Sequence, residues 1–155
     1  MAREVEKELL WRLGRLVTRW AFVEQCISDY FVHLVEGNPV LMIAVTANVS
    51  QNAITGWTRT LLQLRDTNDP EFVEKVLQVL NDVDELRPQR NALVHGLWTT
   101  EGPADSALVQ TIRLDRREVL KEEVVTAADL DDLIESVEDV IRDLVSILNA
   151  VGVTT

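Results

Sequence analysis

The sequence has little of what stabilises secreted or membrane-embedded chains. It contains one cysteine, Cys26, so no disulfide can form within the chain, and a reducing cytoplasm is the expected compartment. No apolar run approaches the roughly 20 residues that a membrane-spanning helix needs. The N-terminus is charged and amphipathic and lacks the apolar segment of a signal peptide. These absences predict a cytoplasmic protein without a membrane partner.

The motifs of common cofactor sites are also absent. The sequence has no zinc-ligand spacing, phosphate-binding P-loop, dinucleotide-binding glycine fingerprint or serine-nucleophile elbow. The acidic stretch DLDDLIESVED lacks the spacing of a calcium-binding EF-hand and is typical of a solvated helix face. We therefore expect no metal and no cofactor.

The charge is strongly acidic overall but uneven. A net charge of −11 argues against broad, non-specific binding to nucleic acid, because a phosphate backbone would be repelled. Residues 1–20, however, hold five bases and three acids, whereas residues 118–155 hold ten acids and only two bases. Locally, an anionic ligand could still meet a positive surface.

Four segments of the chain carry the apolar periodicity of helices. A length of 155 residues predicts one domain, 1–155, with a core of its own. Apolar residues recur at spacings of three and four along each segment, and Pro88 should kink or restart the third one. The segments run over about 3–36, 40–65, 70–95 and 126–148.

Local signals mark the ends of these segments. Asn38 and Asp69 are candidate N-caps, each followed by proline, and Thr126 with Asp129 forms an acidic variant of a capping box. After His95 the pattern alternates in GLWTT and ALVQTIRLD around the turn-rich EGPADS, which predicts a β-hairpin. The expected fold is all-α: an antiparallel four-helix bundle with a small β-hairpin inserted between the third and last helices.

Several apolar side chains are assigned to the core on this pattern. The broad apolar content of the first helix leaves enough surface for a dimer contact, although the core alone could use it. The residues expected to be buried include Trp11, Trp20, Trp57 and Cys26.

The stretch LRPQRNALVHGLW gathers an arginine, an amide and an imidazole where the third helix stops. Asn91 and His95 are four residues apart and share one helical face, which Arg87 extends by a turn. Arg90 precedes His95 by five residues, about 140° around the helix, and its long side chain can reach toward the same side. The three side chains are therefore candidates for one site.

These groups suit the cleavage of RNA by internal attack. The 2′-hydroxyl must lose a proton and the leaving 5′-oxygen must gain one, which a histidine can manage near neutral pH. An arginine can hold the phosphate through a bidentate fork. Asn91 could orient His95 or donate to a phosphate oxygen, and no metal is required. One histidine cannot easily serve as both acid and base, so a symmetric dimer with two copies of His95 is attractive.

The segment RNALVH resembles the R-x4–6-H motif of the HEPN superfamily, including the polar residue that commonly follows its arginine. The resemblance implies a dimeric helical bundle that cleaves RNA without metal, in toxin–antitoxin, phage-defence or RNA-processing systems. It implies active-site roles for Arg90, Asn91 and His95, an RNA substrate, and a regulatory partner such as an antitoxin. The phrase WAFVEQ also resembles an acidic position of some HEPN groups, and on that analogy Glu24 would approach Arg90 or His95.

Each of these residues also has a plainer interpretation. His95 can cap the helix by bonding its last carbonyls, and Asn91 can satisfy backbone groups there. Arg90 can pair with Asp84 or Glu85 on the surface. The protein would then be a non-catalytic dimeric bundle that binds a protein or a nucleotide.

Three further features stay open on the sequence alone. Trp98 could stack on a base or anchor the hairpin. Glu24 is either a solvated residue or a partner of Arg90. A stripe of arginines on the first helix either contacts RNA or pairs with neighbouring acids, the second being favoured; it comprises Arg12, Arg15 and Arg19.

Overall fold

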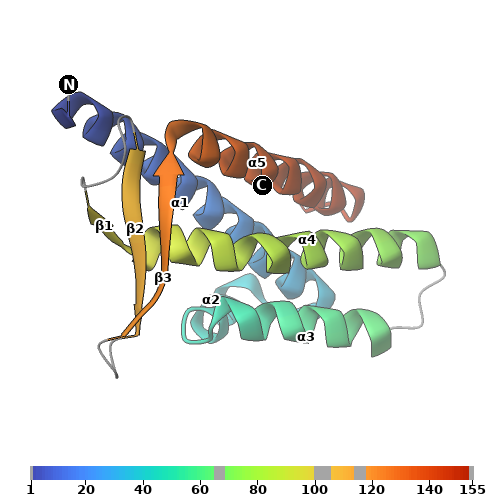
Figure 1. Ribbon diagram of the computed structural model, residues 1–155. Helices are drawn as coiled ribbons and strands as arrows, with labels where there is room; N and C mark the ends of the chain where they lie inside the picture. Colours follow the sequence, from blue (N-terminus) through green and yellow to red (C-terminus); the bar gives the residue numbers. More distant parts are fainter. Residues whose placement is uncertain (1, 65–68, 100–105, 114–117, 154–155) are drawn as a thin grey trace. The chain divides into compact units, whose positions relative to one another are not determined.

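The computed structural model describes residues 2–64, 69–99, 106–113 and 118–153 (Figure 1). These residues form five helices and one small antiparallel sheet of three strands in the order β1-β2-β3. The chain is therefore mainly helical, as predicted. The elements are α1 (Ala2–Leu34), α2 (Pro39–Thr46), α3 (Gln51–Leu64), α4 (Pro70–His95), β1 (Leu97–Thr99), β2 (Ser106–Arg113), β3 (Glu118–Thr126) and α5 (Ala127–Ala150).

The predicted helix over 40–65 is wrong in one respect, because it is two helices. The helix α2 ends at Thr46, and α3 begins at Gln51 after a short turn. Two polar side chains stabilise the break: Asn48 Nδ2 donates to the carbonyl of Ala44, and the hydroxyl of Ser50 accepts from the amide of Ala53. Side chains of this kind compete with helical backbone bonds and so favour helix ends.

The predicted hairpin is also incomplete, since it is a three-stranded sheet. The strand β3 pairs with β2 over its length, with a register shift between Thr111 and Ile112. Its sequence EVLKEEVVT has two adjacent glutamates and no regular alternation of apolar and polar residues. The strand was therefore not predicted from the sequence. In the sheet, Gln110 donates to Glu122 directly across the pair, so the acid gains a partner that sequence alone does not reveal.

Other local predictions are confirmed. Asn38 accepts hydrogen bonds from the amides of Val40 and Leu41, and Asp69 accepts one from the amide of Phe72. Because these bonds depend on residues only two or three positions apart, the sequence contains all the information they need.

The chain divides into two compact units, and α1, α4 and α5 contribute residues to both. Unit 1 comprises Met1–Trp20 and Asp84–Glu138; unit 2 comprises Ala21–Val83 and Asp139–Thr155. Each unit has its own buried apolar side chains and is described by itself.

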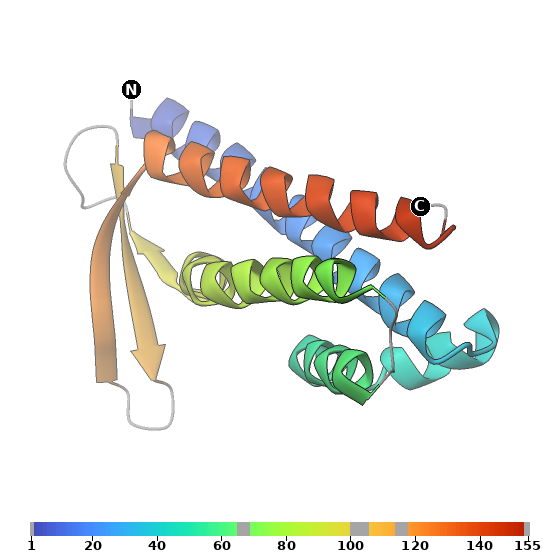
Figure 2. The ribbon, with the colours of Figure 1, turned by 90° about the vertical axis from the view of Figure 1, so that its right-hand side faces the viewer.

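In unit 1 the three strands lie beside the C-terminal end of α4 and the start of α5 (Figure 2). One face of the sheet contributes to the core, because Ala107, Val109 and Val125 are buried. The other buried apolar residues of this unit come from the helices; they are Leu9, Leu16, Trp20, Leu93, Leu130, Leu133, Ile134 and Val137.

In unit 2, helices supply all of the buried apolar residues that the structure describes. They include Cys26, which is 0% exposed, as predicted for a core cysteine. The others are Val23, Ile27, Tyr30, Phe31, Leu34, Ile54, Leu62, Val76, Val79, Leu80, Val83, Val140, Ile141, Leu144, Ile147 and Leu148.

The tryptophans do not all lie in the core. Trp20 is buried, as predicted, but the predictions for Trp11 and Trp57 are wrong, because these side chains are 63% and 43% exposed. Apolar periodicity shows that a helix has an apolar face, but not whether another element covers it.

None of the described helices is both long enough and apolar enough to cross a membrane.

Candidate functional site

The candidate site lies where α4 ends, within unit 1. A kink or a restart was expected at Pro88, and of these the restart does not occur, because one helix continues through Pro88 to His95. It stops at Gly96, where an added Cβ would lie 2.4 Å from the carbonyl oxygen of Ala92 and 2.5 Å from Val109 Cγ1. Only glycine lets the chain pass this close to its own helix and to β2, which gives the pair His95-Gly96 a structural reason.

Trp98 connects β1 to the last turn of α4 through a hydrogen bond. Its indole Nε1 donates to the carbonyl oxygen of Leu93 at 2.7 Å. That carbonyl is one of the groups left without a helical partner at a helix C-terminus. Of the two interpretations open for Trp98, the structure supports the anchor, and the bond fixes the backbone on both sides of His95.

Arg90 is held by an amide and an aromatic ring. Its Nη1 donates to Asn91 Oδ1 at 2.9 Å, and its Cζ lies 5.7 Å from the centroid of the Trp20 ring. Its Nε is buried and has no hydrogen-bond partner among the described residues. Both of these partners are neutral groups, whereas the ion pair considered with Asp84 or Glu85 does not form within the described structure.

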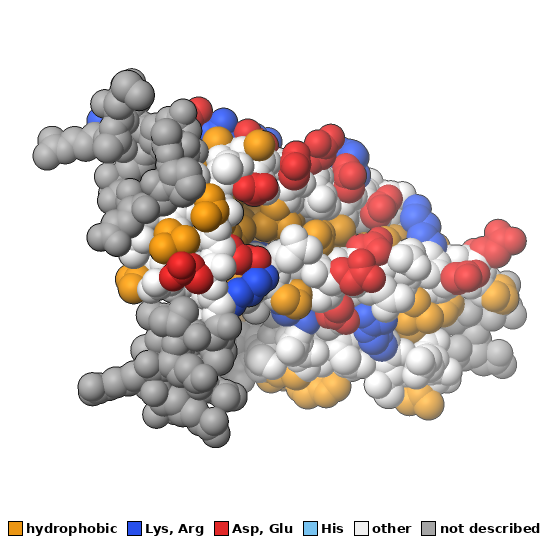
Figure 3. Space-filling view, in the orientation of Figure 1, with side chains coloured by type: hydrophobic (Ala, Val, Ile, Leu, Met, Phe, Trp, Pro, Cys, Tyr) orange, Lys and Arg blue, Asp and Glu red, His pale blue; other side chains and the backbone are white. Residues whose placement is uncertain are grey.

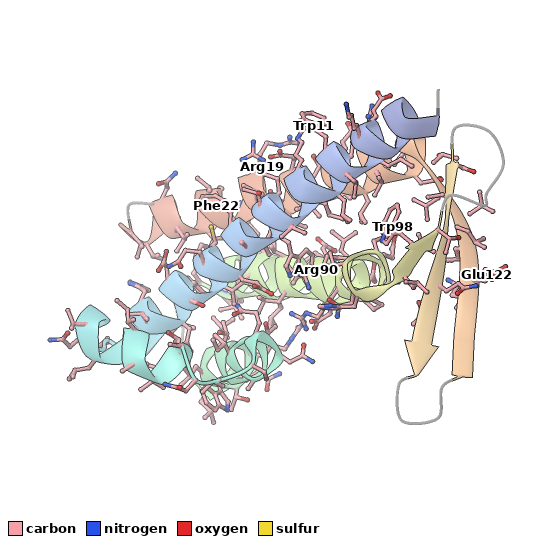
Figure 4. All side chains as sticks on the ribbon, turned by 90° about the vertical axis from the view of Figure 1, so that its left-hand side faces the viewer. Trp11, Arg19, Phe22, Arg90, Trp98 and Glu122 are labelled. Carbon is pink, nitrogen blue, oxygen red and sulfur yellow. The ribbon has the colours of Figure 1, made fainter. Side chains whose placement is uncertain are left out.

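His95 is the last residue of α4 and its side chain is exposed, while Arg90 and Asn91 are half-buried. The structure therefore brings Arg90 and Asn91 together directly. Among the described residues, no hydrogen bond or ion pair joins His95 to either of them, so His95 shares only their helix end. Figure 4 shows Arg90 and Trp98 visible from one side of unit 1, along with Trp11 and Arg19 of α1.

The supporting residues are placed differently. Arg87 forms an ion pair with Asp84, with 2.8 Å between Nη1 and Oδ1. Glu24 belongs to unit 2, so its expected approach to Arg90 or His95 stays a prediction. Within unit 2 the backbone carbonyl of Glu24 accepts a hydrogen bond from Gln51 Nε2 at 3.1 Å, and the residue lines a cavity of about 440 Å³.

The arginines of the α1 stripe form ion pairs with acidic residues of α5. Arg12 Nε donates to both carboxylate oxygens of Asp131, at 2.9 and 3.0 Å, and Arg19 Nε lies 2.7 Å from Glu138. Arg15 also contacts Glu138, at 3.6 Å. Of the two interpretations of this stripe, the pairing with acids is the one the structure supports.

A cavity of about 590 Å³ lies on another side of α4. Its lining includes Pro88, Gln89 and Leu93 from the helix and Val125 from β3. None of Arg90, Asn91 and His95 lines it. The motif therefore lies outside this cavity, with His95 exposed and Arg90 and Asn91 half-buried at the helix end.

Sequence reasoning missed the role of Trp20. The residue precedes Arg90 by 70 positions and looks like any apolar member of the α1 stripe. No local signal pairs an indole with a distant guanidinium, because the contact exists only once α1 and α4 pack within unit 1.

This arrangement can bind an anion. The guanidinium keeps its positive charge beside neutral partners, and a planar guanidinium is well suited to a phosphate group. An exposed imidazole, that of His95, lies at the same helix end and is accessible to a ligand. Among the residues that the structure describes, no group of three or more His, Cys, Asp or Glu side chains is placed to hold a metal ion.

Comparison with known proteins finds no family model, no curated protein and no solved structure that matches this chain.

Proposed function

We propose that the protein is an endoribonuclease of HEPN type that cleaves RNA without metal, as a homodimer. Arg90, Asn91 and His95 form its active site, and toxin–antitoxin or phage-defence systems are the expected setting, with an antitoxin-like protein as regulator. The observation that carries the proposal is the Arg90 guanidinium, which Asn91 and Trp20 hold without neutralising its charge, in the last turns before the exposed His95.

In this reaction the RNA 2′-oxygen attacks the adjacent phosphorus and the bond from phosphorus to the 5′-oxygen breaks. One imidazole takes the proton of the 2′-hydroxyl, and a second imidazole gives a proton to the leaving 5′-oxygen. The two copies of His95 in a homodimer supply these two roles. Arg90 stabilises the extra negative charge of the phosphorane, and the products are a 2′,3′-cyclic phosphate and a 5′-hydroxyl.

The test is cleavage of a panel of structured and single-stranded RNAs by purified protein in the presence of EDTA. We expect products that end in 2′,3′-cyclic phosphate. His95→Ala and Arg90→Ala should each lower the rate by at least about 100-fold, the usual effect of removing a proton-transfer group or a charge-stabilising donor.

The matched control is His33→Ala, because His33 is the other of the two histidines in the sequence. Its ring stacks on Tyr30 with centroids 6.2 Å apart, in unit 2, and its removal should leave cleavage unchanged. Circular dichroism melts of all variants separate lost chemistry from lost folding. Equal cleavage by the wild type and both site variants would exclude the proposal.

Two observations favour a second candidate function, the non-catalytic bundle that binds a protein or a nucleotide. Arg90 Nε is buried, and the motif lines neither of the two cavities described above. If the motif is structural, Arg90→Ala and Asn91→Ala will lower the melting temperature, and no RNA in the panel will be cut by the wild type.

A further inference from the structure

Unit 2 contains a cavity of about 440 Å³ between α1 and α2. Residues of the second half of α1, of α2 and of the start of α3 line it, and these segments follow one another in the chain (Figure 2). Its volume falls within the range of small-molecule sites. In Figure 3 the surface where α2 and α3 lie in Figure 1 is mostly orange and white, with few charged side chains. We call this space the α1–α2 cavity.

The charged side chains that line the α1–α2 cavity are all acidic. Glu24 and Asp29 supply two carboxylates, whereas no Lys, Arg or His is present among the described residues of the lining. Basic residues are missing from this whole part of the chain, because no Lys or Arg occurs between Arg19 and Arg59. The half-buried Asp29 carboxylate accepts a hydrogen bond from the amide Nε2 of Gln25 at 2.7 Å. That amide is neutral and does not balance the charge of the carboxylate.

The uncharged polar side chains of the lining also present acceptors. A hydroxyl has only one hydrogen to donate. The hydroxyl of Ser28 donates it to the carbonyl of Glu24, and that of Thr46 to the carbonyl of Met42, each at 2.9 Å. Toward a ligand, both hydroxyl oxygens can therefore only accept. Gln51 Nε2 donates to the carbonyl of Glu24 at 3.1 Å, which leaves its Oε1 as an acceptor. The lining thus offers mainly acceptors to a ligand.

The cavity beside the end of α4 has charged groups of both signs. Its Lys121 forms an ion pair with Glu123, and its Asp129 accepts hydrogen bonds from Thr126. One of its two carboxylates is therefore already paired with a cation of the same lining. The α1–α2 cavity has no cation among its described lining residues, so a positive charge inside it has to come from a ligand.

We propose that the α1–α2 cavity binds a small aliphatic diamine. Its two ammonium groups balance the charge of the two carboxylates, and each can donate several N–H bonds to the acceptors of the lining. The carboxylates belong to residues five positions apart on α1. This spacing is about 7.5 Å along the helix axis, which a short alkyl chain can span. The methylene groups of the diamine contact the apolar part of the lining, which includes Val32 and Ile43.

Other ligands fit this lining less well. An anion such as a phosphate would meet two negative charges and be repelled. A metal ion is disfavoured, because no group of three or more His, Cys, Asp or Glu side chains is placed to hold one among the described residues. A single lysine side chain of a partner protein brings one ammonium group and leaves the second carboxylate unmatched. The proposal goes beyond the nuclease and does not depend on it.

The first experiment tests the class of ligand by isothermal titration calorimetry of the full chain with putrescine. Near-physiological salt screens weak binding to the generally acidic surface, so saturable binding of one putrescine per chain is the expected result. Butylamine has the same carbon chain with one ammonium group, and the diol of the same length has none. Both should bind at least about tenfold more weakly, because a charge-assisted hydrogen bond is lost.

The second experiment locates the binding with a matched pair of carboxylates. Asp82 accepts a hydrogen bond from Gln78 Nε2 at 2.8 Å, the same arrangement on α4 that Gln25 and Asp29 have on α1. Asp82 does not line the α1–α2 cavity. Asp29→Asn should therefore weaken putrescine binding at least about tenfold, whereas Asp82→Asn removes an equal charge and should leave the affinity unchanged.

A third variant blocks the cavity without altering its charge. Ala47→Phe adds a ring at a lining residue that is itself exposed, so the fold should tolerate it. Putrescine binding should be lost although both carboxylates remain. Circular dichroism melts of all three variants separate lost binding from lost folding.

The outcomes decide the proposal without reference to RNA cleavage. Absence of putrescine binding to the wild type overturns it, and so does equal weakening by Asp29→Asn and Asp82→Asn, which would indicate general attraction to an acidic surface. Equal affinity for butylamine and putrescine overturns the diamine as ligand. Binding of a lysine-containing peptide without binding of putrescine would instead assign the cavity to a protein partner. Failure of the nuclease alone leaves the binding results intact.

Discussion

Two regions of unit 1 hold their arginines in different ways. At the α1–α5 seam, defined by the pairs Arg12–Asp131 and Arg19–Glu138, each guanidinium meets a carboxylate. The hydrogen bond to Asp131, followed by the one to Glu8, raises the pKa of Arg12 above its ordinary value. The positive charges of these arginines are therefore balanced by neighbouring carboxylates.

At the end of α4 the arrangement is the opposite. Arg90 meets the neutral amide of Asn91 and the face of Trp20, and it has no carboxylate partner in the part of the chain that the structure describes. A neutral partner fixes the direction of a guanidinium but does not cancel its charge. The difference teaches that arginines of similar appearance in the sequence can have charged or neutral partners in the fold, and only an arginine with neutral partners keeps an unbalanced charge for an anionic ligand.

The largest expected effect tests this contrast with one matched pair of substitutions. Arg90→Lys keeps the charge but loses the planar fork that Asn91 and Trp20 orient, so RNA cleavage should fall about 100-fold. Arg12→Lys makes the same chemical change at the seam and should leave cleavage unchanged. Single-turnover rates on one RNA substrate measure both.

Circular dichroism spectra of both lysine variants provide the folding control. If the two lysine variants lose cleavage equally, the seam and the helix end do not differ in the way proposed.

The next effect concerns stability and compares one glycine from each region. Gly96→Ala places a methyl group 2.4 Å from the Ala92 carbonyl, which is backbone and cannot move aside easily. We expect the free energy of unfolding to fall by about 2 kcal/mol, as in other overpacked sites. Gly14→Ala on α1 has nothing within 4 Å of the added Cβ and should raise the free energy of unfolding by about 0.5–1 kcal/mol, because alanine favours helix.

Urea denaturation of both variants and the wild type measures these opposite shifts. A stable Gly96→Ala would mean that the end of α4 is less tightly packed against β2 than the structure indicates.

The same contrast explains how much of the molecule the sequence could predict. Helix starts at Asn38, Asp69 and Thr126 were predictable because each cap depends on residues within three positions. The motif at the end of α4 was visible in the sequence for the same reason, because Arg90, Asn91 and His95 lie within six residues of one another. Its role as an active site stays a prediction.

What the sequence could not predict depends on contacts between distant segments. The indole of Trp20 contacts Arg90 across 70 positions, and β3 acquires its place by pairing with β2. Trp11 has the spacing of a core residue but remains exposed, because no described element covers that face of α1. The spacing of apolar residues shows that a helix has an apolar face. Whether that face is buried depends on which other elements pack against it.

The smallest expected effect is a dependence on pH where α5 begins, next to the seam. Hydrogen bonds from the Thr126 hydroxyl and then its backbone N–H, at 2.7 and 2.8 Å, hold the pKa of Asp129 below its ordinary 3.8. A lowered pKa in the folded state stabilises the fold fully above the ordinary pKa, and this contribution is lost as the pH falls below 3.8 through the folded-state value.

Asp129→Asn should therefore lower the melting temperature at pH 7 by an amount that corresponds to at most about 1 kcal/mol, the usual size of an exposed cap. The difference in melting temperature between wild type and variant should shrink as the pH falls below 3.8 and through the lowered pKa of Asp129, because the wild-type carboxyl then becomes neutral too. Asp132→Asn removes the same charge in the next turn of α5 and should show a smaller gap at pH 7, since it does not bond Thr126. If the difference in melting temperature between wild type and Asp129→Asn stays constant from pH 7 to well below pH 3.8, the charge of the carboxylate contributes nothing to the cap. Hydrogen bonding by a neutral side chain would then be enough to stabilise the start of α5.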